Sequence, residues 1–316
     1  MRALPDFADI LAARTRIAPY VRHTPVLTSA TLDAAVGAEL FFKCENLQAV
    51  GAFKVRGATN AVMALPDDVA RRGVVTHSSG NHGAALAFAA ELRGIPAWIV
   101  MPENAPKAKA ANVRAYGGTI CFCAPTLTAR EEMCAVVAQE RGATLVHPYN
   151  DDRVIAGQGT AALELVEEVA SIDAVVAPCG GGGLLSGTAI AVGGARPEAR
   201  VYGAEPRGAD DAQRSLAAGH IIPQEDPRTI ADGLRSSLGE RTFAILSTRI
   251  EAIATASEEA IVRAMRMSWE ALRVIVEPSS ALPLACLLEN TLELRAQRVG
   301  IILTGGNVDL DRLPWQ

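Results

Sequence analysis

The chain has 316 residues, enough for about two domains, or one large domain with an insertion, at the usual ~150 residues per domain. Thirty basic and thirty-five acidic residues give a net charge of -5, which excludes the basic excess typical of nucleic-acid-binding proteins. With 49% hydrophobic and only 4% aromatic residues, the chain is globular and poor in the rings on which bases stack. This composition predicts an α/β protein with a small-molecule ligand and no nucleic-acid partner.

The sequence contains no membrane or export signal that we recognise. No apolar run reaches the ~18 residues that a membrane span requires, and the N-terminal segment carries acidic residues among its apolar ones. The six cysteines are scattered, without a CxxC pair or histidines at metal-ligand spacing. We therefore expect reduced, mostly buried thiols in a cytoplasmic protein without a membrane partner.

Short segments rich in Val and Ile alternate with stretches of helical periodicity, which predicts βαβ units and a parallel sheet covered on both faces. A helix is predicted from Ser257, with Ile261, Met265, Trp269 and Leu272 on one face. The predicted strands are 73–77, 97–101, 118–122, 174–178, 201–205 and 300–304.

The segment CGGGGLLSGT (179–188) follows a predicted strand and precedes an apolar helix. Consecutive glycines let the backbone form a concave set of N–H donors at a helix N-terminus, which suits a phosphate group. A flexible linker is the alternative, but linkers are not bracketed by a buried strand and an apolar helix. The loop lacks the GxGxxG spacing of dinucleotide sites, and Thr188 stands where a P-loop requires lysine. A monophosphate cradle is the interpretation that survives.

Two further loops follow predicted strands. HSSGNHGAAL (77–86) offers hydroxyl, amide, imidazole and backbone donors at another helix N-terminus, which suits a carboxylate, although it is equally well explained as a cap and turn. LTGGN (303–307) places Thr304 at the end of a central strand, where its hydroxyl could meet a ring nitrogen. Both loops belong at the edge of the sheet where ligands bind in open parallel folds.

Lys54 lies between Phe53 and the predicted start of a helix. Packing against an aromatic ring and the positive potential of a helix N-terminus both disfavour the ammonium form, and Schiff-base chemistry requires a neutral amine. An ordinary surface lysine is the alternative, and the phosphate loop makes it the weaker one.

A phosphate cradle, a Schiff-base lysine and a hydroxyl for a ring nitrogen together describe a pyridoxal phosphate enzyme. From about residue 23 to the end, the chain also resembles the serine racemase and serine/threonine dehydratase family of fold-type II pyridoxal phosphate enzymes, which includes hydroxyaspartate dehydratases. The segments that carry the resemblance are GAFKVRGATNA, THSSGNHGAALA, HPYNDDRVIAGQGT, PCGGGGLLSG, AEPRGADDAQRS, IADGLRSSLG, VEPSSA and ILTGGNVDL.

The resemblance implies an α/β fold like that of the tryptophan synthase beta chain, with two open, twisted, mostly parallel sheets flanked by helices. Residues 1–72 and 149–316 would form the large cofactor-binding domain, and residues 73–148 a small mobile domain that closes over the substrate. Because the chain ends soon after ILTGGNVDL, we expect no C-terminal regulatory domain of the kind found in long biosynthetic threonine dehydratases.

The resemblance also assigns the cofactor site. Lys54 would bind pyridoxal 5'-phosphate as a Schiff base, Phe53 would pack on its ring and Asn81 would hydrogen-bond its hydroxyl group. Thr304 would meet the pyridine nitrogen, which favours elimination or racemisation over transamination. The phosphate would be held by Gly180, Gly181, Gly182 and Gly183.

The implied reaction is α,β-elimination from a 3-hydroxy L-amino acid, threonine or serine, to a 2-oxo acid and ammonia. Lys54 would remove the Cα proton, and Ser79 on the opposite face could return one and cause racemisation. A second carboxylate could pair with Arg130. The alternative is a solvent-facing Arg130 beside Glu131 and Glu132. The alternatives are therefore 3-hydroxyaspartate dehydratase, giving oxaloacetate and ammonia, and serine racemase. The implied substrate residues are Ser78, Ser79, Asn81, His82, Arg130, Tyr149 and Ser236.

Glu205, Asp211 and the carbonyl of Ala209 match a divalent-cation site of the family. Oxygen ligands select Mg²⁺, Mn²⁺ or Ca²⁺, whereas the alternative is a solvated acidic turn. A homodimer is expected by family analogy alone. The other functional classes are a non-catalytic sensor on the same fold and an NAD-dependent oxidoreductase, which the failed GxGxxG match disfavours.

Overall fold

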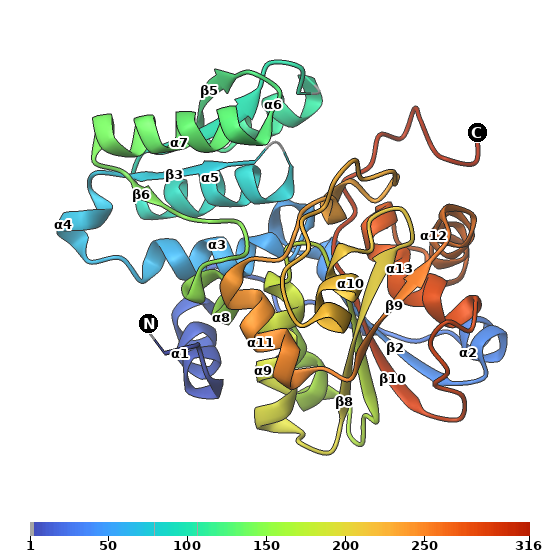
Figure 1. The fold of residues 1–316 in the computed structure, drawn as a ribbon. Coiled ribbons are helices and arrows are strands. Elements are labelled where there is room, and N and C mark those ends of the chain that lie inside the picture. The colour runs from blue at the N-terminus through green and yellow to red at the C-terminus, as the bar shows by residue number, and fades with distance from the viewer. Residues whose placement is uncertain (1–2, 79, 106) are drawn as a thin grey trace.

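The structure is a computed structural model that describes residues 3–78, 80–105 and 107–316. Strands and helices alternate along most of these residues (Figure 1). The described strands are β1 (Val26–Leu27), β2 (Glu39–Cys44), β3 (Val74–His77), β4 (Ala97–Pro102), β5 (Thr119–Cys123), β6 (Thr144–Leu145), β7 (Ala174–Pro178), β8 (Arg200–Pro206), β9 (Ala252–Ala256) and β10 (Arg298–Leu303). The described α-helices are α1 (Phe7–Ile17), α2 (Ala30–Val36), α3 (Lys54–Met63), α4 (Asp67–Ala70), α5 (Asn81–Arg93), α6 (Lys107–Ala115), α7 (Leu127–Arg141), α8 (Asp152–Glu168), α9 (Gly183–Ala195), α10 (Asp211–Ala218), α11 (Glu240–Arg249), α12 (Glu258–Leu272) and α13 (Pro278–Leu288). Short 3-10 helices are η1 (Glu45–Leu47), η2 (Ala49–Gly51) and η3 (Asp232–Leu234).

The larger sheet has the strand order β1-β2-β10-β7-β8-β9 among the described residues. All neighbours in it pair in parallel except β1 and β2, which are antiparallel. Because β10 lies between β2 and β7, it is a central strand, as the sequence predicted. The carboxyl ends of β2, β10, β7, β8 and β9 therefore lie at one edge of this sheet.

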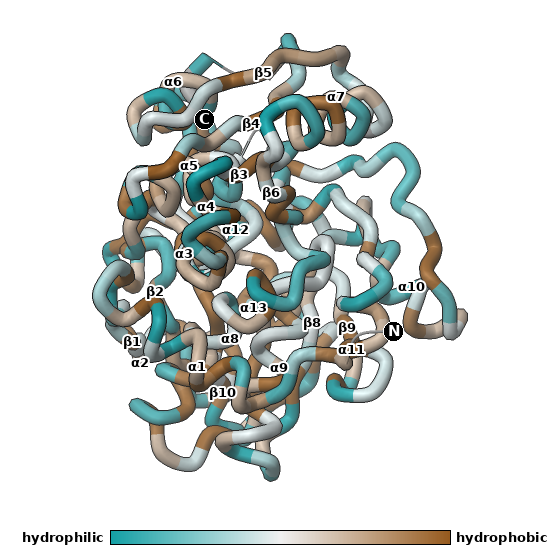
Figure 2. Tube along the Cα trace, turned by 90° about the vertical axis from the view of Figure 1, so that its left-hand side faces the viewer, coloured by the Kyte–Doolittle hydropathy of each residue, from teal (hydrophilic) through white to brown (hydrophobic). Residues whose placement is uncertain are grey.

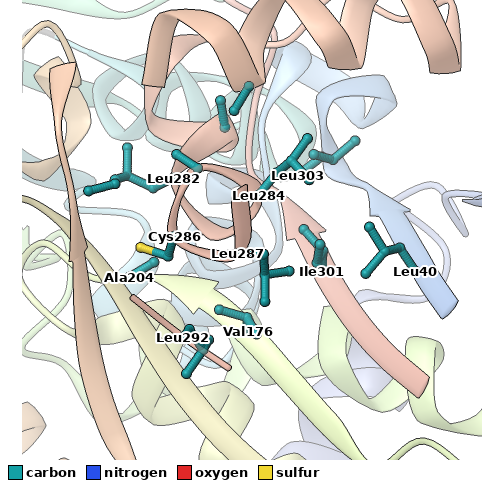
Figure 3. Close-up of a cluster of buried hydrophobic side chains, with 14 of the residues drawn as sticks. Leu40, Val176, Ala204, Leu282, Leu284, Cys286, Leu287, Leu292, Ile301 and Leu303 are labelled. Atoms are coloured by element: carbon teal, nitrogen blue, oxygen red, sulfur yellow. The ribbon is translucent and has the colours of Figure 1, made fainter. Parts of the chain in front are cut away.

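Both faces of the larger sheet are covered by helices. Side chains alternate along its strands, so Val176 and Ile301 enter one core with α12 and α13, whereas Val175 and Ile302 enter another with α8 and α9. Figure 3 shows Val176 and Ile301 beside the leucines of α13. This double burial explains why the strands read as continuous apolar runs.

The smaller sheet has the order β5-β4-β3-β6 and is parallel throughout. Helices α5 and α6 pack on one of its faces and α7 on the other (Figure 1). All of these elements fall within the predicted range 73–148. The boundaries of a separate domain there, and its mobility, stay predictions.

The described part of the chain confirms the predicted α/β class with two mostly parallel sheets. It also confirms the helix after Ser257, whose hydroxyl accepts a hydrogen bond from the N–H of Ala260 and caps α12. Figure 2 shows hydrophilic stretches mostly along outer helices and loops. None of the described helices combines the length and the apolar character needed to cross a membrane.

Candidate active site

Three loops from different parts of the chain begin at carboxyl ends of parallel strands. The glycine loop follows β7 and leads into α9, Thr304 follows β10, and Ser78 follows β3 just before α5. In this type of fold, helix N-termini at that edge offer unpaired N–H groups to anionic ligands. The structure thus gives each loop the strand-to-helix or strand-to-turn setting that the sequence predicted.

The glycine loop has little room for side chains. A Cβ added to Gly181 would lie 2.3 Å from the ring of Tyr149, and one added to Gly183 would lie 2.8 Å from Cβ of Tyr149. Gly182 has a φ of +84°, which disfavours any side chain. Since α9 begins at Gly183, the N–H groups of its first turn have no preceding helical carbonyl to bind. The loop is therefore a backbone cradle suited to a phosphate.

Lys54 is the first residue of α3, and its amine is held close to the loop before α8. Lys54 Nζ donates to the carbonyl oxygen of Pro148 at 3.0 Å and lies 5.1 Å from the centre of the Phe53 ring. Burial lowers the pKa of Lys54 to about 8, although the Glu277 carboxylate opposes that effect. Near pH 7, roughly one amine in ten is then neutral, far more than for an ordinary lysine.

Thr304 is buried and sits directly beside Phe53. The N–H of Phe53 donates to the carbonyl of Thr304 at 2.9 Å, so the end of β10 is joined to the residue before Lys54. The Thr304 hydroxyl lies 3.0 Å from the hydroxyl of Ser280 on α13. The Ser280 hydroxyl also donates to the carbonyl of Gly305. Thr304 is thereby fixed in orientation next to Phe53 and Lys54.

Asn81, the first residue of α5, reaches across to the larger sheet. Its Nδ2 donates to Glu277 Oε1 at 3.0 Å, and its Oδ1 accepts from Asn307 Nδ2 at 2.9 Å. Glu277 caps the start of α13, and burial raises its pKa to about 7, with the Asn81 hydrogen bond opposing. The backbone N–H of Glu277 donates to the carbonyl of Gly305, next to Thr304. Asn81 is thus tied to the same region as Thr304.

The imidazoles of His82 and His147 lie near Lys54, and burial is the main influence on the pKa of each ring. Burial lowers the pKa of His147 to about 4 and that of His82 well below the usual value. His82 Nε2 lies 3.3 Å from the Val146 carbonyl, while its buried Nδ1 has no partner among the described residues. The pKa of His77 is also lowered, chiefly by burial. These rings are neutral near pH 7 and leave Lys54 without a cationic neighbour among them.

The loop at the start of α5 is described only in part. Ser78 directly follows β3. Its N–H donates to the Val100 carbonyl, and its hydroxyl accepts from the N–H of Gly80. Ser79, the predicted second catalytic residue, lies outside the described residues. Its assignment stays a prediction.

Tyr149, Ser236 and Arg130 form the next group. Burial raises the pKa of the Tyr149 hydroxyl, with Glu131 as the next cause, and Ser236 and Arg130 oppose the increase. Arg130 on α7 is half-buried and lies close enough to influence the pKa of both Tyr149 and His77. The structure therefore places Ser236 and Arg130 near Tyr149, which packs against Gly181 and Gly183.

The predicted cation ligands lie at the carboxyl end of β8 and the start of α10. Glu205 and Asp211 are both fully buried, and Glu205 accepts the N–H groups of Ala212 and Gln213. Neither carboxylate oxygen of Asp211 has a hydrogen-bond partner among the described residues. Burial raises the pKa of Asp211 to about 6 and that of Glu205 well above its usual value. In the described part of the chain, no three His, Cys, Asp or Glu side chains gather as metal ligands. The expected set differs from such a group because it has two carboxylates and one backbone carbonyl.

Several residues of the site were not predicted. The Pro148 carbonyl, Glu277, Ser280, Asn307 and His147 contact predicted residues but were not singled out. Glu277, an acid directly before a proline that starts a helix, looks like an ordinary helix cap in the sequence. A backbone carbonyl carries no side-chain signal at all.

Comparison with known proteins identifies the group to which this arrangement belongs. A sequence family described as "Pyridoxal-phosphate dependent enzyme" matches residues 17–305. The chain belongs to this pyridoxal phosphate family. It is an enzyme of the family's ammonia-lyase and racemase branch, and its fold is that of the fold-type II members.

Relatives within the pyridoxal phosphate family cover nearly the whole chain. A beta-hydroxyaspartate dehydratase of Paracoccus denitrificans (strain Pd 1222) is 55% identical over 312 residues, 99% of each chain. A serine racemase of Arabidopsis thaliana is 50% identical over 313 residues, covering 98% of this chain and 95% of the relative. The solved structure of maize serine racemase has a TM-score of 0.96 at 48% identity and covers 98% of this chain and 95% of its own.

The residues in the structure fit pyridoxal phosphate. The glycine cradle has no space for side chains, the Lys54 amine has a depressed pKa, and the Thr304 hydroxyl is buried beside them. Together these groups match a phosphate, an aldehyde and a ring nitrogen.

Proposed function

We propose that the chain is a dehydratase (ammonia-lyase) that converts a 3-hydroxy L-amino acid to a 2-oxo acid and ammonia. The observation that carries this proposal is the Lys54 amine, which has a pKa of about 8 and lies 3.0 Å from the Pro148 carbonyl. Such an amine can both attach a carbonyl cofactor and act as a base near neutral pH. The family relationship supports the same reaction class.

In this proposal Lys54 is the attachment lysine, and the cofactor supplies an electron sink that acidifies the Cα–H of the amino acid joined to it. The Lys54 amine would take the Cα proton of the substrate on Nζ. The N-terminus of α5, with Ser78, Asn81 and His82, holds the substrate α-carboxylate. Thr304 stays neutral and orients the ring, while Gly180, Gly181, Gly182 and Gly183 hold the phosphate. Ser79 remains the proposed proton donor on the opposite face, which would serve racemisation.

A second candidate substrate is 3-hydroxyaspartate. Arg130 is half-buried near Tyr149 and Ser236, so a guanidinium and two hydroxyls could receive a second carboxylate. The Paracoccus dehydratase is named for this substrate. Threonine and serine lack that carboxylate, so Arg130 distinguishes the two candidates.

A parallel assay of the purified, cofactor-loaded enzyme tests the proposed function. We expect 2-oxo acid and ammonia in equal amounts from at least one of L-threonine, L-serine and the two L-3-hydroxyaspartate diastereomers. Chiral chromatography of unreacted serine measures racemisation in the same samples. D-Serine appearing faster than pyruvate would make the chain a racemase, and no turnover of any substrate would favour a non-catalytic sensor.

We also propose a divalent cation at Glu205, Asp211 and the Ala209 carbonyl. The support is that Asp211 is buried with unpartnered oxygens and a pKa of about 6. Because this pKa is raised, the cation-free fold gains stability below the ordinary pKa of aspartate and loses it as pH rises through about 6. A cation should relieve that loss at high pH only.

We expect Mg²⁺ or Mn²⁺ added after EDTA to raise the melting temperature by ~5 °C at pH 8 and by almost nothing at pH 5. The expected increase corresponds to filling a site at about one hundred times its dissociation constant. Differential scanning fluorimetry of wild type and Asp211→Asn measures it, and the variant should not respond. An equal response of both proteins, or none from wild type at pH 8, would refute the site.

Three further features complete the proposal. Residues 73–148 act as a small domain that closes over the substrate, which small-angle scattering with and without a substrate analogue can detect.

The protein is a cytoplasmic homodimer, by analogy with its family. The free cysteines agree with a reducing compartment, since all but the partly exposed Cys121 are buried. Sedimentation velocity checks the dimer, and fractionation of the source cells checks the compartment.

A further inference from the structure

Behind the site lies a cluster of four charged residues, Lys43, Glu45, Arg56 and Glu164, which we call the buried charge cluster. Lys43, Glu45 and Arg56 have no exposed surface, and Glu164 is only 9% exposed. Arg56 Nε and Nη2 donate to the Glu45 carboxylate at 2.7 and 2.8 Å, and Nη1 and Nη2 donate to the Glu164 carboxylate at 2.6 and 2.8 Å. Lys43 Nζ lies 2.6 Å from Glu164 Oε2. Two cations thus face two carboxylates.

Arg56 and Glu164 stay charged. Burial opposes the charge of Arg56, but Glu45 and then Glu164 raise its pKa further above the usual range. Burial likewise opposes the charge of Glu164, and hydrogen bonding from Arg56 holds its pKa below the usual value. Buried ion pairs of this kind are weak sources of stability because desolvation offsets much of their attraction, but their bonds fix geometry. The cluster is therefore better explained by the geometry that its bonds fix than by the stability that they add.

The cluster joins four elements at one point. Lys43 is in β2, Glu45 is in η1 directly after it, Arg56 is in the first turn of α3, and Glu164 is in α8. Helices α3 and α8 cross closely here, because a Cβ on Gly157 would lie 2.6 Å from Cα of Gly57. The N–H of Gly57 also donates to Gln158 Oε1 on α8 at 3.0 Å. Arg56 thus fixes how α3 sits on α8 at a crossing where Gly57 and Gly157 let the two backbones approach closely.

Helix α3, helix α8 and, through its pairing with β10, strand β2 are each connected to a group of the active site. Helix α3 begins at Lys54, two residues before Arg56, and α8 begins at Asp152, four residues after Pro148. The bond from Lys54 Nζ to the Pro148 carbonyl therefore depends on the placement of both helices. Strand β2 pairs with β10, which leads into Thr304, and Thr304 accepts the N–H of Phe53.

We propose that the buried charge cluster is a positioning element that sets the place of the Lys54 amine beside the Pro148 carbonyl. Arg56 is its central member and acts through the first turn of α3, without touching substrate or cofactor. The importance of the cluster for catalysis rests on the proposed function of Lys54. Its effect on where the Lys54 amine lies does not depend on that function.

The pKa of Lys54 reports where its amine lies, because that pKa depends on the surroundings of the amine. The titratable groups that influence it or are influenced by it are Glu277 at the start of α13, His82 on α5 and His147 before α8. Burial is the main reason that the pKa of Lys54 is about 8. If the first turn of α3 shifts, the amine gains water and its pKa rises toward the ordinary value of lysine.

The test is Arg56→Lys in the full chain, which keeps the charge of the cluster but lacks the planar fork that binds two carboxylates. The rate at which an amine-selective acylating reagent modifies Lys54 in cofactor-free protein, followed by peptide mass spectrometry across pH, gives the apparent pKa. The wild-type chain has four lysines, Lys43, Lys54, Lys107 and Lys109, and Arg56→Lys adds another at position 56. Fragment-ion spectra therefore assign the modification to Lys54. We expect a midpoint near pH 8 for wild type and at least one unit higher for the variant. In the loaded enzyme, kcat should fall ~10- to 100-fold while KM changes less than threefold.

The matched control is Arg93→Lys. Arg93 also binds α3, through the carbonyls of Val62 and Leu65, but at the end remote from Lys54. It should cost stability without changing the Lys54 midpoint or kcat. Should Arg56→Lys fail to fold, Glu164→Asp keeps the charge and moves the carboxylate, and we expect an upward shift of the midpoint of about half a unit.

The proposal would be overturned if folded Arg56→Lys kept the wild-type midpoint and kcat. The same holds for folded Glu164→Asp, if it is used instead. The cluster would then be a stabilising feature only. A shifted midpoint in an enzyme whose Lys54 proves not to attach the cofactor would refute the proposed function and keep the positioning role. The two failures are therefore distinguishable.

Discussion

Replacing Lys54 by alanine is expected to abolish the yellow colour of the cofactor-loaded protein and to lower kcat for 2-oxo acid formation by at least ~10³-fold. The physical reason is that Lys54 Nζ is both the attachment group and the base in the proposed reaction, and among the described lysines it alone bonds the Pro148 carbonyl. Lys43 is held in the buried charge cluster, Lys107 is exposed and Lys109 pairs with Asp232. Absorbance spectra and steady-state assays of the same preparation measure both effects.

Lys107→Ala is the matched control, since it removes an exposed lysine from α6 and should leave colour and kcat unchanged. Comparable melting temperatures of the three proteins would show that the fold is intact. A Lys54→Ala protein that keeps the colour and more than a tenth of wild-type kcat would refute the assignment of Lys54.

The second large effect is expected at Arg130. If 3-hydroxyaspartate is a substrate, Arg130→Leu should lower kcat/KM for it by ~10²-fold, because losing one partner of a hydrogen-bonded charge pair costs about 2–5 kcal/mol. Turnover of serine, which has no second carboxylate, should change less than threefold. Parallel assays with the two substrates give the ratio, and Arg130→Lys should restore only part of it because lysine lacks the guanidinium fork.

Arg141→Leu, at the last turn of the same helix α7, controls for loss of positive charge. Equal losses for both substrates in Arg130→Leu would show that Arg130 stabilises the loop region rather than selecting the substrate. No loss for either would return Arg130 to the role of a solvent-facing helix residue.

The sequence was sufficient wherever the signal was local. Lys54 at a helix start, Thr304 at the end of a central strand and the glycine loop before α9 each depend on neighbouring residues, so their positions relative to helices and strands were predicted and are confirmed. Strands β1, β2, β6 and β9 were not predicted. Strands β1 and β6 have only two residues each, which carry no periodicity.

The remainder of the site depends on contacts between distant segments. Asn81 and Glu277 are 196 residues apart, and Lys54 and Pro148 are 94 apart, so only the folded chain brings them together. Arg56 lies two residues from Lys54 and was not singled out, because a buried arginine cannot be told from a surface one without its carboxylate partners. Burial also sets the depressed pKa of Lys54, which the sequence predicted only in direction.

Borohydride trapping tests the central claim most directly. Reduction of the cofactor-loaded wild-type enzyme converts an imine between cofactor and protein into a stable amine, which peptide mass spectrometry can locate. The account predicts a single phosphopyridoxyl adduct, on the Phe53–Lys54 peptide. An adduct on Lys43, Lys107 or Lys109 instead, or no adduct in a protein that has bound the cofactor, would contradict it.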